Sequence, residues 1–268
     1  VNYLYNAIKT DPYDINKIYL VLTGDIAFSG KQKEYVKATE LIDSLSKKLK
    51  QIYENTKISV ICVPGNHDCN FDLDTQVRRN MLEKMSYQSI GEKDLSVIET
   101  CISIQKDFWE FYKNFNTSPK NKLFYQLKDQ IGNKTILFNC YNTAWMSQKN
   151  EVLGSLFFPI KNLKSKDFIN NMDICISIFH HPVTWFNYSN ESNNRKELQE
   201  YLESTSNILI YGHEHYDDQR KVTDLHKNTD TIYISGAKFQ PTSQEASGFQ
   251  TIKIDLETNE SIITNYIL

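Results

Sequence analysis

Short apolar runs that end in polar residues recur along the chain. Four of them occupy residues 17–22, 57–63, 173–179 and 207–211. The first reads KIYLVL and stops at Gly24-Asp25. Uninterrupted apolar runs of this length are typical of strands that are covered on both faces. The pattern therefore predicts buried strands with polar groups directly after their ends.

A helical period separates the first two predicted strands. Apolar residues recur every three or four positions between Tyr35 and Ile52, which predicts one long amphipathic helix. Just before it, Ser29 and Gln32 have the Ser-x-x-Gln spacing of a capping box, so we expect them to fix the start of this helix. Residues 2–7 are expected to belong to another helix.

The second half of the chain reads mainly as strands. Residues 123–127 and 134–140 flank Gly132-Asn133, which is a strong hairpin signal. Three more strands are expected at residues 231–235, 249–254 and 261–267. Strand–helix alternation followed by antiparallel strands predicts a layered α/β sandwich.

The 268 residues suit one domain, which we expect to span 1–268 with a polar helical insertion or cap at 69–118. No apolar run approaches the roughly 18 residues of a membrane span, so no membrane association is expected. The net charge is −3, and the chain lacks the dense stripe of basic residues that would indicate a nucleic-acid-binding surface. Five cysteines without a Cys-x-x-Cys pair favour a reducing, cytoplasmic location.

Five of the six histidines lie in polar groups just past the predicted strands. These groups, together with Gly24-Asp25, are Gly65-Asn66-His67-Asp68, His180-His181-Pro182 and Gly212-His213-Glu214-His215. Strand ends in α/β sheets are where ligands collect, and carboxylate, amide and imidazole donors together suit zinc, manganese or iron. If residues 213–215 are extended, the rings of His213 and His215 lie on the same side.

The four groups, read in order as LTGDIAFSG, VPGNHD, FHHP and YGHEH, resemble the signature blocks of the calcineurin-like metallophosphoesterase superfamily. The resemblance covers Gly24 to His215 and is strongest to the bacterial branch that contains cyclic-nucleotide phosphodiesterases. It implies a four-layer α-β-β-α sandwich of two mixed sheets flanked by helices. It also implies a centre of two divalent metal ions, such as manganese, iron or zinc.

The resemblance also assigns roles to single residues. Asp25 would bridge the two metal ions, and His215 would bind the first of them. The second ion would take three further ligands, which are Asn66, His180 and His213. His67 would face the substrate as phosphate binder or leaving-group acid, and Asp68 would orient its ring.

One block of the superfamily pattern, Asp-x-His, is missing from this chain. Without it the second metal site keeps four protein ligands, whereas the first keeps only Asp25 and His215, too few for tight binding. We expect that an N-terminal strand carrying Asp-x-His belongs to the natural protein; the alternative is a degenerate site. Further domains of a longer protein are compatible with this expectation.

Three other residues are candidate substrate contacts. His181 adjoins a predicted ligand, Asn142 follows a predicted strand end, and Trp185 could stack on a base. Each also has an ordinary structural interpretation as a hydrogen-bonded or packed residue. Glu214 is expected to point away from His213, toward solvent or a lysine.

Three functions remain open at this point. The first is a phosphodiesterase that hydrolyses phosphodiester bonds of a nucleotide or nucleic acid by attack of a metal-activated hydroxide. The second is a nuclease module, acting on DNA or RNA, of a larger defence or repair protein. The third is a metal-poor pseudoenzyme that serves as a binding scaffold. The sequence leaves the oligomeric state open.

Overall fold

A computed structural model describes residues 2–9, 15–84, 95–163, 171–189, 193–214, 218–226, 228–239 and 247–267. The helices are α1 Asn2–Lys9, α2 Gln32–Ile52, α3 Gln76–Lys84, α4 Leu95–Ile102, α5 Lys106–Tyr112 and α6 Asn194–Thr205. The strands are β1 Lys17–Leu22, β2 Lys57–Cys62, β3 Phe124–Ile131, β4 Lys134–Tyr141, β5 Ile174–Ile178, β6 Ile208–Tyr211, β7 Gln219–Asp224, β8 Thr229–Ser235, β9 Gly248–Ile254 and β10 Ser261–Ile267.

The largest sheet has six strands in the order β3-β4-β5-β6-β8-β7. Strands β4, β5, β6 and β8 are parallel, while β3 and β7 pair antiparallel at the two edges. The predicted hairpin is confirmed: β3 and β4 are antiparallel on either side of Gly132, whose φ of 59° suits the turn. The sheet is therefore mixed, as expected.

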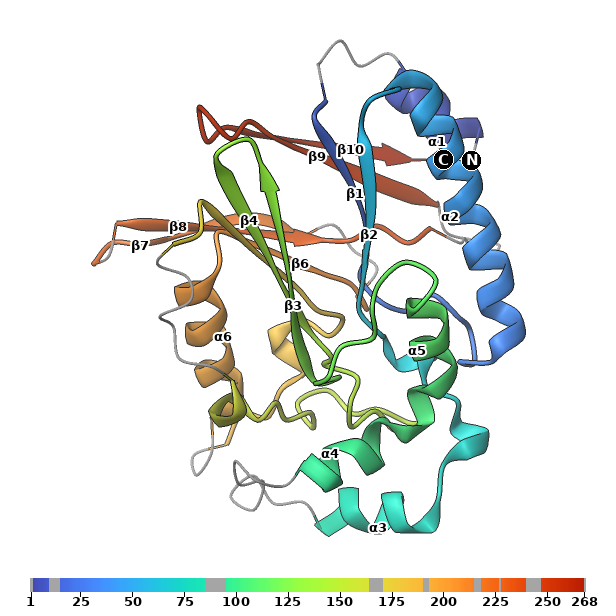
Figure 1. Cartoon of the computed structure of the whole chain (residues 1–268). Coiled ribbons are helices and arrows are strands. Elements are labelled where there is room, and N and C mark those ends of the chain that lie inside the picture. Colours follow the sequence, from blue (N-terminus) through green and yellow to red (C-terminus); the bar gives the residue numbers. More distant parts are fainter. Residues whose placement is uncertain are drawn as a thin grey trace.

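The layers run α6, six-stranded sheet, β1 and β2, then α2 across the view in Figure 1. The two inner layers are in contact, because the Tyr19 ring of β1 lies 4.7 Å from the Phe138 ring of β4. Tyr19 also donates a hydrogen bond to Asp129 of β3, and Lys17 forms an ion pair with the same carboxylate. The predicted α/β layering with flanking helices is thus confirmed.

The second layer of strands is present as two separate pairs within the described residues. β1 and β2 are parallel, with Lys17 opposite Lys57 and Leu22 opposite Cys62. β9 and β10 form an antiparallel hairpin in its own sheet. Instead of the expected second mixed sheet, the described residues form one parallel pair of strands and one antiparallel pair.

The start of α2 differs in detail from the predicted capping box. The helix begins at Gln32, but Glu34 rather than Gln32 reaches back to Ser29. Its carboxylate accepts from the backbone N and the hydroxyl of Ser29, and from the N of Lys31. A carboxylate near a helix start is favoured over an amide because it accepts more strongly and complements the helix dipole.

The described part of residues 69–118 is helical, as predicted. The aromatic side chains of α5 are buried and pack against α2, where Phe111 stacks on Tyr35 at 5.1 Å. Buried Arg78 of α3 donates to the carbonyls of Cys101 and Ser147. Figure 1 shows α3 and α4 at the lower end of the molecule, below α5.

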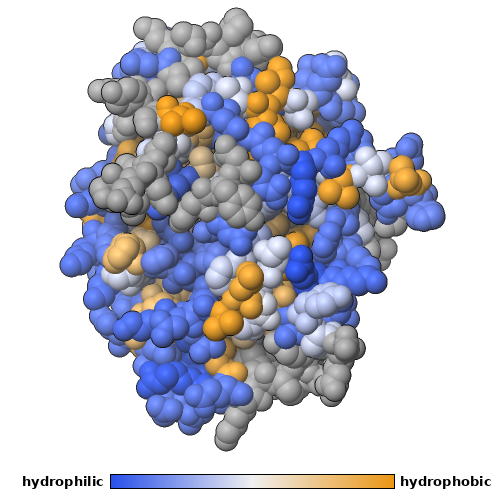
Figure 2. Space-filling view, turned by 180° about the vertical axis from the view of Figure 1, so that it is seen from behind, coloured by the Kyte–Doolittle hydropathy of each residue, from blue (hydrophilic) through white to orange (hydrophobic). Residues whose placement is uncertain are grey.

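All five cysteines are buried and free. On the face shown in Figure 2, hydrophobic residues form small separate groups within a largely hydrophilic surface. Within the parts of the chain that the structure describes, none of the helices has both the length and the apolar character that a membrane crossing requires.

Candidate metal centre

Four strand ends deliver the predicted ligands to one place. Asp25 follows β1, Asn66 follows β2, His180 follows β5 and His213 follows β6. Asp25 and His213 have positive φ values of 54° and 71°, in the left-handed region that side-chain-bearing residues rarely adopt. Such backbone strain clusters at functional sites, where the surrounding structure enforces it.

The donor atoms of these four side chains converge. His180 Nε2 lies 2.9 Å from Asn66 Oδ1, 3.1 Å from His213 Nδ1 and 3.4 Å from Asp25 Oδ1. His213 Nδ1 lies 3.1 Å from Asn66 Oδ1. The Nδ1 of His180 donates to the carbonyl of Thr23 at 2.7 Å, which leaves the lone pair of a neutral ring on Nε2, facing the other three donors.

These separations fit a divalent metal ion. Ligand atoms about 2.1 Å from a zinc-like ion lie about 3.0 Å apart in octahedral and about 3.4 Å apart in tetrahedral coordination. The four donor–donor distances named above range from 2.9 to 3.4 Å. Two imidazoles, one amide oxygen and one carboxylate also form a donor set typical of borderline transition metals. The residues present therefore fit one such ion.

Two glycines make this approach possible. A Cβ on Gly65 would lie 2.2 Å from Asp25 Oδ1, and a Cβ on Gly24 would lie 2.5 Å from His180 Nδ1. Gly24 also has a φ of 100°, which other residues rarely adopt. The polar groups pack directly against the backbone of neighbouring strand ends.

Electrostatic interactions and burial favour the metal-binding protonation states of Asp25 and His213. Burial raises the pKa of Asp25, but His180 and His67 outweigh this and hold it below its usual range. Burial, with His181 and His180 nearby, lowers the pKa of His213 to about 3. Burial lowers the pKa of His180, but the Asp25 carboxylate raises it by more, so the net shift is upward. At neutral pH the site holds an ionised Asp25 and a neutral His213, the forms that bind metal.

His67 lies at the edge of this centre and is exposed. Its backbone N donates to Asp25 Oδ1 at 2.9 Å, which joins it to the ligand set. Its ring Nδ1 donates to the carbonyl of Phe28 at 2.9 Å. The other ring nitrogen, Nε2, is then the one available to a bound substrate.

Asp68 does not orient the His67 ring, contrary to the expectation. It is fully buried and accepts from the backbone N of Ala27 at 3.0 Å, of Gly65 at 2.9 Å and of Ile26 at 3.3 Å, and from the hydroxyl of Tyr35 at 2.9 Å. Burial and the Asp25 charge raise its pKa to about 6, against these hydrogen bonds. Asp68 instead fixes the loop after β1 against the loop after β2.

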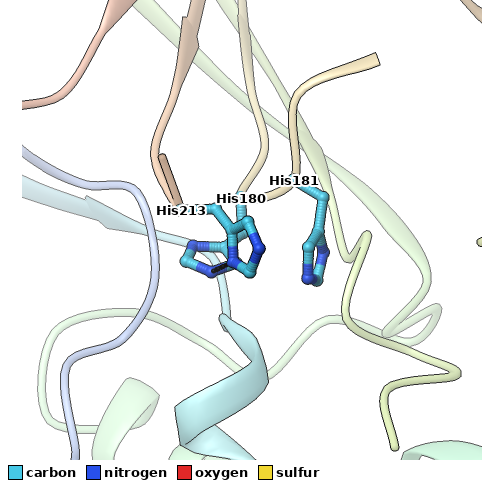
Figure 3. A group of neighbouring side chains, drawn as sticks. All are labelled: His180, His181 and His213. Carbon is cyan, nitrogen blue, oxygen red and sulfur yellow. Dashed lines mark hydrogen bonds between the residues drawn. The ribbon is translucent and has the colours of Figure 1, made fainter. Parts of the chain in front are cut away.

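His181 lies beside the ligands and is completely buried. Figure 3 shows it next to His180 and His213, and one ring nitrogen of each of the three lies within 4.8 Å of the others. Its Nε2 lies 3.1 Å from Glu151 Oε2. Glu151 could not be found from the sequence, because it stands alone in a polar loop without a neighbouring motif.

Trp185 lies at the rim, half-buried. Its ring meets the His213 ring edge-on at 4.2 Å, and its Nε1 donates to Glu214 at 3.0 Å. The expected partner of Glu214, solvent or a lysine, is therefore wrong. The expected extended segment is wrong too, because His213 has a positive φ and Glu214 N bonds to Gly212 O. His215 lies outside the described residues.

Asn142 is not placed to contact substrate. Its side chain is fully buried, exchanges two hydrogen bonds with Gln105 at 2.7 and 3.2 Å, and donates to the carbonyl of Lys122. These bonds engage both atoms of its amide group. The structure therefore corrects the expectation: Asn142 ties the end of β4 to the segment before α5.

Comparisons with known proteins identify one matching family. The family model of the calcineurin-like phosphoesterases matches residues 4–217. A search of curated proteins finds no match. Similar solved structures include a hypothetical protein from Pyrococcus horikoshii OT3, at 13% identity and a TM-score of 0.36, covering 98% of this chain and 79% of that chain. Another is an archaeal phosphodiesterase at 13% identity and a TM-score of 0.35, covering 94% and 99%.

The family model alone carries the assignment, since it covers most of the chain and includes all four strand-end groups. The chain belongs to the calcineurin-like phosphoesterase family. Its chemistry is accordingly that of a metal-dependent phosphoric ester hydrolase.

Proposed function

We propose that this protein is a divalent-metal-dependent phosphodiesterase. The observation that supports the proposal most directly is that Nε2 of His180 lies 2.9–3.4 Å from donor atoms of Asn66, His213 and Asp25. A bound metal ion at this position would act as a Lewis acid on the phosphoryl group and would lower the pKa of water. Exposed His67 is placed to protonate a leaving alcohol, and the resemblance to cyclic-nucleotide phosphodiesterases favours a diester as the substrate.

His67 is the proposed general acid. Its Nδ1–H is fixed on the Phe28 carbonyl, so a proton on Nε2 is the one that it can deliver to a departing oxygen. The backbone bond from His67 to Asp25 holds the ring at the edge of the ligand set. Release of a poor leaving group, such as the alkoxide of a nucleoside, gains most from this proton.

Two metal ions remain part of the proposal. Asp25 would serve both, and His215 would contribute to the first, as the family resemblance implies. The Trp185 ring beside His213 would line the substrate side of the centre, and buried His181 would support His213 from behind. The substrate would be a nucleotide or nucleic-acid diester.

The experiment measures metal content and hydrolysis together. The purified protein is loaded with manganese, iron or zinc, its bound metal is counted by elemental analysis, and it is assayed on bis(p-nitrophenyl) phosphate and p-nitrophenyl phosphate. We expect bound metal and faster turnover of the diester. Asp25→Ala is expected to lose both metal and activity, whereas Asp43→Ala, an exposed aspartate of α2, keeps both.

Two results would overturn the proposal. A protein that binds metal but hydrolyses only the monoester is a phosphomonoesterase. A protein that binds no metal and hydrolyses neither ester is a scaffold rather than an enzyme.

A further inference from the structure

An aromatic side chain stands exposed beside the proposed general acid. Phe28 is 80% exposed, although most phenylalanines of the described chain are buried. An exposed aromatic ring of this size gives up the favourable free energy of burial. Its ring stacks on the His67 imidazole, with 5.6 Å between centroids and 28° between planes.

The loop that carries Phe28 is fixed on both sides. Before it, the backbone N of Ala27 donates to Asp68. After it, both the backbone N and the hydroxyl of Ser29 donate to Glu34 at the start of α2. The exposed ring is therefore presented by a held backbone, which reduces the conformational entropy lost when a ligand packs on it.

The position of Phe28 relative to His67 indicates which part of a substrate would contact the Phe28 ring. Because His67 Nδ1 bonds to the Phe28 carbonyl, Nε2 is the nitrogen that faces the leaving-group oxygen. The alcohol that carries this oxygen would then lie beside the His67 imidazole, on whose face the Phe28 ring stacks. The leaving group therefore emerges next to an exposed, apolar, planar surface.

We propose that Phe28 is a stacking platform for the leaving group and gives the enzyme a preference for phosphodiesters whose leaving alcohol carries a planar ring, such as a nucleoside. This inference rests on the proposed phosphodiesterase function. Stacking of a base on an aromatic side chain is favourable beyond the gain from buried area. We expect a preference of about tenfold in kcat/KM, which is typical of one such stacked base.

The test compares two symmetric diesters that differ only in the bases. One is the 5′,5′-phosphodiester of two thymidines, and the other carries two 1,2-dideoxyribose groups, joined through their 5-oxygens, in their place. Both release a primary alcohol on a five-membered ether ring, so the reacting bonds have similar chemistry. Wild type, Phe28→Ala, Phe28→Trp and the exposed control Leu225→Ala are assayed on both with manganese.

We expect Phe28→Ala to lower kcat/KM for the thymidine diester about tenfold while the base-free diester changes less than twofold. Phe28→Trp and Leu225→Ala should keep the preference. An equal loss on both diesters would overturn the inference, since Phe28 would then act only by positioning His67, and the phosphodiesterase function would stand.

A binding measurement separates this inference from the function itself. Calorimetry compares thymidine 5′-phosphate with 1,2-dideoxyribose 5-phosphate on the metal-loaded wild type and on Phe28→Ala. If wild type cleaves neither diester, the proposed function fails; a base-dependent affinity that Phe28→Ala removes still supports the platform. Equal affinity for the two ligands on wild type would overturn it.

Discussion

The Nε2 atom of His181 lies 3.1 Å from Glu151 Oε2, in a pair that is almost completely removed from solvent. Burial raises the pKa of Glu151, but its bond to His181 outweighs this and the net shift is downward. The ring of His181 faces that of His213, with 4.5 Å between centroids. Glu151 thus places a negative charge behind the proposed metal ligands.

Removing this charge should weaken metal binding. Glu151→Gln keeps the shape of the side chain but loses the charge, and partners of this kind are typically worth about 10–100-fold in metal affinity. We expect a rise of at least about tenfold in the manganese dissociation constant, measured by calorimetry. Glu200→Gln, on an exposed face of α6, is the control. Unchanged affinity in Glu151→Gln would show that the pair only fills space.

His67 should affect turnover more than metal binding. His67→Ala is expected to reduce kcat by about 10²–10⁴-fold, the usual scale for loss of an acid–base group. Bound metal should stay at the wild-type level because the four ligands are intact. His226→Ala, an exposed histidine on the turn after β7, should leave both quantities unchanged. Loss of metal from His67→Ala would contradict the assigned role.

Arg78 and Arg79 offer a matched pair for stability. Both contact Asp74, but Arg78 is buried and also donates to two backbone carbonyls, whereas Arg79 is exposed. Arg78→Met leaves two buried carbonyls without their donor and should lower the free energy of unfolding by about 2–4 kcal/mol. Arg79→Met should change it by less than about 0.5 kcal/mol. Urea unfolding followed by circular dichroism measures both, and equal effects would contradict the anchoring role of Arg78.

The bond between the two strand layers should depend on pH. Burial raises the pKa of Asp129, but Lys17 and Tyr19 outweigh this and lower it overall. A carboxylate with a depressed pKa stabilises the fold above its unfolded value of about 3.9, and this contribution disappears as pH falls through the lower folded value. Asp129→Asn should therefore be about 1 kcal/mol less stable than wild type at pH 7, with the difference shrinking below about pH 4.

Urea unfolding of Asp129→Asn at several values of pH between 3 and 7 measures this difference. Asp43→Asn, an exposed aspartate of α2, should follow wild type throughout. A deficit in Asp129→Asn that is the same at every pH would mean that the amide disturbs packing rather than removing an ion pair.

The sequence predicted the strands, and the residues that gather at their ends, better than the supporting contacts. Apolar runs mark buried strands, and Asp25, Asn66, His180 and His213 are readable because each directly follows such a run. By contrast, the partners of Asp68 come from three separate segments, and only the folded chain brings them together.

The backbone at His213 was unreadable for a similar reason. A Gly-His-Glu-His segment after a strand suggests continued extension, yet the contacts of His213 with His180 and Asn66 hold its φ at 71°. Asn142 is also a polar residue at a strand end, but its side chain forms hydrogen bonds with the buried Gln105 amide instead of facing the site. Local pattern places a residue near the site, and tertiary contacts decide where its side chain points.

The contact of Gly65 with Asp25 Oδ1 and of Gly24 with His180 limits how this enzyme can evolve. A single added methyl at either glycine would overlap a ligand or the backbone beside it. Substitution of Gly24 or Gly65 is therefore expected to disturb both the fold and the group of proposed metal ligands. Changes of substrate preference would instead come from residues outside this group of ligands, such as exposed Phe28.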